Sequence, residues 1–304
     1  MTILASHNSP STRKDNNVCV RILCLHGKGG NGPKFVNSSL KPLRALVDER
    51  VAAMTNSPNP NDKIILDHQL SFHWEELTAP YEILSGEDAG GYMWWTMPDG
   101  VRSYNAQEFV ILDGAVANLV LLLIVIQIQN YVQHLNYQKY EGFDKSEALV
   151  MERLFSTEST TSNIDIILGH SQGAILAAAL LSIHERLRNT ENGPMGYILN
   201  GVAWPNPFCR SLLSLAQETS SAIDQLPRII FIMGKTDTIN PIESAMQVHD
   251  SYKAARFDAS IVYHEGGHSV PLGRDENSIG ALNEVVDWII SIAQEKAARL
   301  KADT

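Results

Sequence analysis

The segment IDIILGHSQGAILAAALLSI, residues 164–183, carries the strongest structural signal in the chain. Its first five residues are apolar except for one aspartate, which predicts a short buried strand. Its last ten are mostly Ala and Leu, which favour an α-helix. Gly169 to Gly173 lies between them with the pattern G-x-S-x-G, the strand–turn–helix signature that exposes a serine at a strand's carboxyl end. We therefore expect Ser171 at the tip of a sharp turn whose small flanking glycines let strand and helix pass closely.

Other apolar segments extend this pattern along the chain. Strands are predicted at 18–25, 64–70, 164–168, 197–203, 228–233 and 260–263. Helices are predicted at 33–48, 174–183, 242–254 and 279–300. Strands that alternate with helices predict an α/β fold, a mostly parallel sheet of about six strands with helices on both faces.

Composition excludes some classes of protein. The chain has 304 residues, 44% of them hydrophobic, and a formal net charge of −10. No basic stripe is present, so a nucleic-acid partner is not expected. The three cysteines, Cys19, Cys24 and Cys209, have no metal-binding or redox spacing. We expect free thiols in a reducing compartment and no metal site.

Two segments bear on location. Residues 1–17 are polar and lack the apolar core of a secretory signal, so a disordered lead before a single domain at 18–304 is expected. The apolar run 115–128 is shorter than the roughly 20 residues that cross a bilayer. A buried cap helix is therefore favoured there, and no stable membrane insertion is expected.

A serine nucleophile needs a base, and the base needs an orienting carboxylate. In chains with this serine motif the order is Ser, Asp, His. Asp237 follows the strand 228–233, which brings it to the same edge of the sheet as Ser171. His268 follows the last strand on a loop with two glycines, whereas His264, at the strand end, is more typical of a structural histidine. Glu243 is a fallback acid, but it falls inside the next predicted helix.

The glycine-rich turn 26–32 follows the first strand, where a loop that completes such a site is expected. We expect the backbone N–H groups of Lys28 and Gln172 to form an oxyanion hole. A phosphate-binding loop is the alternative, but the turn lacks the glycine spacing of that motif. Trp94, Trp95 and His170 are candidate substrate-binding residues. Core packing is an equally good interpretation of the two tryptophans.

With these residues in place, the chain resembles the FSH family of serine hydrolases. The matching blocks are RILCLHG (21–27), GYMWW (91–95), PDGVRS (98–103), EGFDKS (141–146), ILGHSQGA (167–174), GKTDTINP (234–241) and HEGGHSVP (264–271). The resemblance implies an α/β-hydrolase fold and a cytoplasmic esterase or thioesterase that needs no cofactor. It also implies catalytic roles for Ser171, Asp237 and His268. The chain departs from the family at His170, where a phenylalanine is usual.

A second departure is the length of the region 86–145, where a cap is expected. In the family, a stretch like 102–109 runs almost directly into one like 141–146, whereas here residues 110–140 intervene. This segment is either a lineage-specific cap helix or translated intron sequence. Sequence alone thus predicts hydrolysis of small-molecule acyl esters or thioesters by way of an acyl-serine. A non-catalytic ligand-binding module, or a lyase or peptidase on the same fold, is the alternative.

Overall fold

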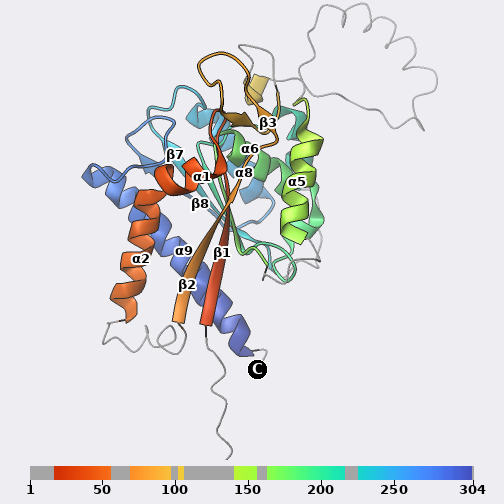
Figure 1. The fold of residues 1–304 in the computed structure, drawn as a ribbon. Helices are drawn as coiled ribbons and strands as arrows, with labels where there is room; N and C mark the ends of the chain where they lie inside the picture. The colour runs from red at the N-terminus through yellow and green to blue at the C-terminus, as the bar shows by residue number, and fades with distance from the viewer. Residues whose placement is uncertain are drawn as a thin grey trace, which may run out of the picture.

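The computed structural model describes residues 17–55, 69–96, 102–105, 140–155, 163–215 and 225–302. They form a six-stranded parallel sheet with the strand order β2-β1-β5-β6-β7-β8 (Figure 1). Its strands are β1 (Asn17–Leu25), β2 (Gln69–Leu77), β5 (Ile166–His170), β6 (Gly196–Asn200), β7 (Arg228–Gly234) and β8 (Ala259–His264). The short strands β3 (Tyr81–Glu82) and β4 (Tyr92–Met93) pair separately and antiparallel. The predicted α/β sheet is confirmed.

Helices cover both faces of this sheet (Figure 1). On one face lie α2 (Lys41–Thr55) and α9 (Glu276–Ala302), and on the other α5 (Phe143–Phe155), α6 (Gln172–Ile183), α7 (Cys209–Leu215) and α8 (Ile242–Ala254). Shorter turns are α1 (Gly32–Lys34), η1 (Phe35–Ser39), η3 (Ser103–Asn105), η4 (Glu185–Arg188) and η5 (Asn206–Phe208). In β1 and β5 to β8, alternate residues belong to two separate hydrophobic clusters, because side chains alternate across a strand.

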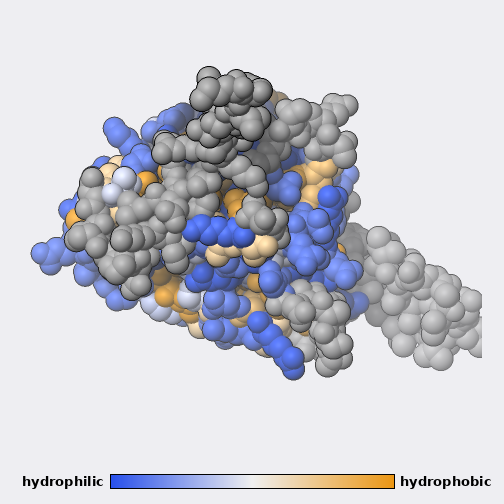
Figure 2. Space-filling model, turned by 90° about the horizontal axis from the view of Figure 1, so that it is seen from below, coloured by the Kyte–Doolittle hydropathy of each residue, from blue (hydrophilic) through white to orange (hydrophobic). Residues whose placement is uncertain are grey.

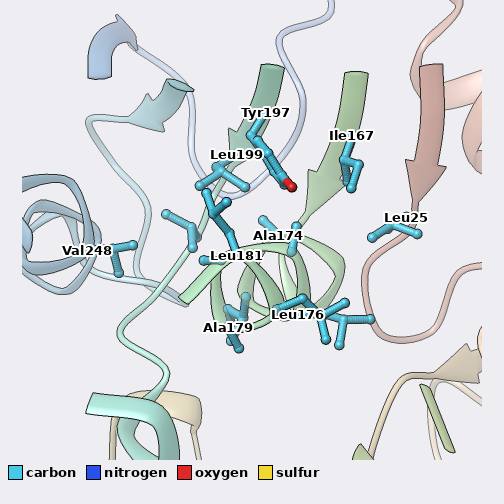
Figure 3. Close-up of a cluster of buried hydrophobic side chains, with 14 of the residues drawn as sticks. Leu25, Ile167, Ala174, Leu176, Ala179, Leu181, Tyr197, Leu199 and Val248 are labelled. Carbon is cyan, nitrogen blue, oxygen red and sulfur yellow. The ribbon is translucent and has the colours of Figure 1, made fainter. Parts of the chain in front are cut away.

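Helix α6 lies at the centre of one cluster. Figure 3 shows Leu25, Ile167 and Leu199 from the strands lying over Ala174 and Leu176 of the helix. Burial on all sides explains the Ala- and Leu-rich sequence of α6, since small side chains let the helix approach the sheet closely. The tight strand–helix packing fixes Ser171 at the carboxyl edge of the sheet.

Strand β2 lies further along the chain than predicted. The expected strand at 64–70 overlaps β2 at only two positions, and 61–68 fall outside the described residues. Leu70, Phe72 and Trp74 alternate with more polar residues and pack against the cluster under α2 and α9. An edge strand with one covered face shows this alternation in place of a continuous apolar run.

The first predicted helix, at 33–48, is interrupted and longer than expected. It consists of α1, the π-helical turn η1 and then α2, which continues to Thr55. Pro42 has no backbone N–H and cannot bond to the preceding turn, which accounts for a break just before α2. The other predicted helices are observed with shifts of a few residues at their ends.

The last helix is tied to the start of the sheet. Lys296 Nζ donates to the Cys19 carbonyl at 2.9 Å and to Asp165 Oδ2 at 2.8 Å. The backbone N–H of Arg21 donates to the same carboxyl at 2.8 Å. Burial raises the pKa of Asp165 and outweighs the opposing effect of Lys296 and Arg21. Three distant parts of the chain therefore meet at one buried carboxyl group.

Seen from the amino ends of the strands, the described surface is mainly hydrophilic, with hydrophobic atoms in separate areas (Figure 2). Within the described ranges, no helix combines the length and apolar composition that crossing a bilayer requires. The predicted cap helix at 115–128 and most of the segment 110–140 lie outside the described residues, as does nearly all of the polar lead at 1–17.

Candidate active site

Ser171 occupies a strained turn between β5 and α6. Its φ angle is 52°, a left-handed value that costs energy in a residue with a side chain. Its N–H donates to the Asn200 carbonyl at 2.9 Å, which joins the turn to β6. A Cβ at Gly169 would lie 2.6 Å from Ala174, and one at Gly173 would lie 2.3 Å from the Leu25 carbonyl oxygen. The sequence expectation that both flanking positions must be small therefore agrees with the packing.

The structure brings Ser171, His268 and Asp237 together. His268 Nε2 lies 2.7 Å from Ser171 Oγ, and His268 Nδ1 lies 2.7 Å from Asp237 Oδ2. The other carboxylate oxygen, Oδ1, accepts the backbone N–H groups of Ile239 and Asn240, each at 2.9 Å. These two bonds fix the carboxylate plane and direct Oδ2 toward the imidazole. The arrangement can transfer a proton away from the serine hydroxyl.

Asp237 is suited to hold a charge beside the imidazole. Burial of the carboxyl raises its pKa, but the hydrogen bonds from His268, Asn240 and Ile239 outweigh that effect and leave the pKa below its usual value. The carboxyl therefore stays ionised at neutral pH. An anion at this place favours the Nδ1–H tautomer of His268, so the lone pair of Nε2 faces Ser171.

Gly201, directly after β6, makes room for the imidazole. Its φ is 58°, and a Cβ there would lie 3.1 Å from His268 Cε1. The Gly201 carbonyl accepts the side-chain amide of Asn240 at 2.6 Å. The sequence gives no sign of these roles for Gly201 and Asn240, because they depend on contacts between three loops that only the folded chain brings together.

The glycine-rich turn after β1 lies beside Ser171. A Cβ at Gly27 would lie 3.1 Å from Ser171 Cβ, so a side chain there would press against the serine. Among the described residues, the backbone N–H groups of Lys28 and Gln172 donate to no protein acceptor, and both remain available to a ligand. The oxyanion role predicted for them remains a prediction, and their positions beside Ser171 are compatible with it.

His26 fixes the orientation of the peptide unit that contains the Lys28 N–H. His26 Nδ1–H donates to the Gly27 carbonyl at 2.7 Å, and the Gly30 N–H donates to the same oxygen at 3.1 Å. Because the peptide is planar and trans, the Lys28 N–H points opposite to that carbonyl. His26 Nε2 accepts the Ala79 N–H at 3.0 Å. Burial lowers the pKa of His26 more than its bond to Gly27 raises it, which keeps the ring neutral.

A recess of about 250 Å³ opens in front of Ser171. Ser171, His268, His170 and Lys28 line it, and Asp88 lies at the same recess, with its carboxylate 4.0 Å from Lys28 Nζ. The volume is at the small end for a ligand site, so it accommodates the reacting group and its nearest atoms.

His170 faces this recess, as expected from the sequence. Its Nδ1 accepts the side-chain amide of Asn200 at 2.7 Å, which places the ring proton on Nε2. The ring stacks on Phe35 at 6.0 Å and lies 5.2 Å from the His268 ring. Burial, together with the nearby His268, lowers the pKa of His170 to about 3. His170 is therefore a neutral polar group beside the serine, where it is available for contact with substrate.

Protonation of His170 is expected to destabilise the fold in acid. Its pKa in the folded chain lies below the usual 6.5, so its contribution to stability is complete above pH 6.5 and is lost as the pH falls toward 3. We expect His170→Phe, which keeps a ring against Phe35, to reduce the loss of unfolding free energy between pH 7 and pH 5 by about 1–2 kcal/mol. Urea unfolding at the two pH values measures this, and an equal loss in both proteins would contradict it.

The two tryptophans lie in the core. Trp94 is 0% exposed and Trp95 1% exposed, and neither lines the recess. The Trp95 ring stacks on Tyr140 at 4.4 Å. Both tryptophans are therefore core residues, which was the alternative interpretation of the sequence. An apolar ring suits a core and a pocket wall equally, so the sequence could not distinguish the two. His264 is likewise buried, and its Nδ1 accepts the Gly266 N–H at 3.2 Å, which matches the structural role expected for it.

Comparisons with known proteins identify a family and a similar fold. A family model described as "Serine hydrolase (FSH1)" matches residues 16–278. Acyl-protein thioesterase 2 from Zea mays is 18% identical, with 93% of this chain and 97% of that one covered and a TM-score of 0.50. Esterase PE8 is 15% identical, with coverage of 91% and 94% and a TM-score of 0.44. A search of curated proteins finds no match. At 18% identity the maize structure shows a likeness of fold alone.

Proposed function

Because the chain belongs to the FSH1 family of serine hydrolases, we propose that it cleaves carboxylic esters or thioesters of acyl chains through an acyl-serine intermediate. The observation that carries this proposal is the position of His268, 2.7 Å from both Ser171 Oγ and Asp237 Oδ2. A serine hydroxyl becomes a nucleophile when such a base takes its proton.

In the first half of the proposed reaction, Ser171 Oγ attacks the acyl carbonyl carbon while its proton moves to His268 Nε2. Negative charge develops on the carbonyl oxygen, which accepts hydrogen bonds from the backbone N–H groups of Lys28 and Gln172. Asp237 stabilises the imidazolium. When the tetrahedral intermediate collapses, His268 gives its proton to the leaving alcohol or thiol, and the acyl group remains on Ser171.

In the second half, a water molecule loses a proton to His268 Nε2 and attacks the acyl carbon. The new intermediate collapses, the carboxylic acid leaves, and the proton returns to Ser171 Oγ. No metal or cofactor takes part in these steps. The acyl donor is a small molecule, and the free thiols of Cys19 and Cys24 are compatible with the proposed cytoplasmic location.

A fluorophosphonate probe tests the proposal. It phosphonylates a serine only when the hydroxyl is activated, so we expect stoichiometric labelling of the intact protein, located at Ser171 by peptide mass mapping. A series of p-nitrophenyl esters from acetyl to palmitoyl, with acyl-thioesters and peptides alongside, then identifies the substrate class. Absence of both labelling and turnover would favour a ligand-binding module, and cleavage of peptides alone would favour a peptidase.

A further inference from the structure

The side chain of Gln172 is buried directly behind the proposed nucleophile. It begins α6 next to Ser171 and is only 6% exposed. A buried amide is costly unless its polar atoms are paired. Here Gln172 Oε1 accepts the backbone N–H of Trp94 at 2.8 Å, and Nε2 donates to the Trp95 carbonyl at 3.0 Å. The side chain thus holds the backbone of the segment 92–95 from within the core.

That segment in turn holds the glycine-rich turn. The Gly29 N–H donates to the Tyr92 carbonyl at 2.9 Å, and the Tyr92 N–H donates to the Gly30 carbonyl at 2.8 Å. The indole N–H of Trp94 donates to the His26 carbonyl at 2.7 Å. A Cβ at Gly91 would lie 2.3 Å from the Gly29 carbonyl oxygen, so the two backbones are in direct contact. Three hydrogen bonds therefore fix the turn that presents the Lys28 N–H.

We propose that Gln172 positions both donors of the oxyanion hole. Its own backbone N–H is one donor, and its side chain, acting through Trp94, places the turn that carries the other, the Lys28 N–H. This inference rests on the proposed function. Alanine or serine at position 172 could not do this, because neither side chain is long enough to accept the Trp94 N–H and donate to the Trp95 carbonyl.

The proposal predicts a specific kinetic defect. A misplaced oxyanion donor weakens binding of the transition state and leaves binding of the substrate unchanged. We expect Gln172→Met, which retains the length and the backbone N–H, to lower kcat about 10- to 100-fold with KM unchanged. Affinity for a trifluoromethyl ketone, whose adduct places an oxyanion in the same site, should fall in proportion to kcat/KM.

A second variant tests the path through Trp94. Trp94→Phe removes the indole N–H that bonds to the His26 carbonyl and keeps a smaller aromatic ring in the core. We expect it to lower kcat in the same way, and we expect the double variant to lose little more than the worse single variant, since both changes act on one path. If Gln172→Met fails to fold, Trp94→Phe with the ketone measurement decides the question by itself.

Ser182→Ala is the matched control. Ser182 is buried in the same helix and donates to the Ala179 carbonyl at 2.7 Å, far from the recess. Its loss should lower the melting temperature without lowering kcat. The proposal is overturned if Gln172→Met behaves like this control, if Trp94→Phe keeps the wild-type kcat, or if the two losses multiply. These outcomes leave the proposed function intact, because they are measured against an active, Ser171-dependent wild-type enzyme.

Discussion

Ser171→Ala is expected to lower kcat for ester hydrolysis on the order of 10⁴- to 10⁶-fold. The substitution removes the hydroxyl that lies 2.7 Å from His268 Nε2 on the strained turn, and with it the proposed acyl-enzyme route. The remaining rate comes from direct attack of water on the bound substrate, which the proposed oxyanion donors still assist. Initial rates on the best p-nitrophenyl ester, with purified variant and wild type side by side, measure the effect.

The control for this variant is Ser214→Ala, which changes an exposed serine of α7 that donates only to the Ser211 carbonyl. It should hydrolyse the ester at the wild-type rate and retain fluorophosphonate labelling, whereas Ser171→Ala should lose both. Circular dichroism and melting curves establish that both variants are folded. Wild-type turnover by a folded Ser171→Ala protein would remove Ser171 from the mechanism.

Asp237→Asn is expected to lower kcat about 10⁴-fold while leaving KM nearly unchanged. The reason lies in the two backbone N–H groups of Ile239 and Asn240, which bond to Oδ1. They require an oxygen at that position, so the asparagine amide nitrogen must face His268. Nδ1 of His268 then has to accept a hydrogen bond from that amide nitrogen, so the ring proton moves to Nε2. The nitrogen that faces Ser171 can then no longer take a proton.

Nitrogen NMR of histidine-labelled protein tests this explanation directly, because it distinguishes the Nδ1–H and Nε2–H tautomers of His268. Asp258→Asn is the matched control, since this carboxylate is 67% exposed and pairs with Arg228 away from the site. It should keep the wild-type kcat and tautomer. A normal kcat in Asp237→Asn would mean that another group orients the imidazole.

The sequence was sufficient to predict which three side chains meet. Ser171, Asp237 and the His268 loop each follow a strand of a parallel sheet, and the carboxyl ends of parallel strands share one edge. A residue just past a strand end can therefore be placed without any knowledge of the strand order. The resemblance to the FSH family, carried by the same blocks, is confirmed by the family match.

The sequence was not sufficient for features that depend on contacts between segments far apart in the chain. The sequence indicated a role only for the backbone N–H of Gln172. Nothing in the neighbouring sequence indicates that its side chain bonds to a segment almost eighty positions earlier. The sequence left Trp94 and Trp95 open between substrate binding and core packing, because aromatic rings suit both a core and a ligand site. Strand β2 was misplaced for a related reason, since an edge strand has only one apolar face.

The attachment of Lys296 to Cys19 and Asp165 has a consequence for biosynthesis. Strand β1 leaves the ribosome long before the helix α9 that covers one face of it. Until that helix is released, the apolar residues of β1 and β5 on this face lack their cover and are open to aggregation. Long-range pairing of this kind also slows folding. A nascent chain stalled before Lys296 would therefore require a chaperone, and removal of the last helical turns would affect yield more than catalysis.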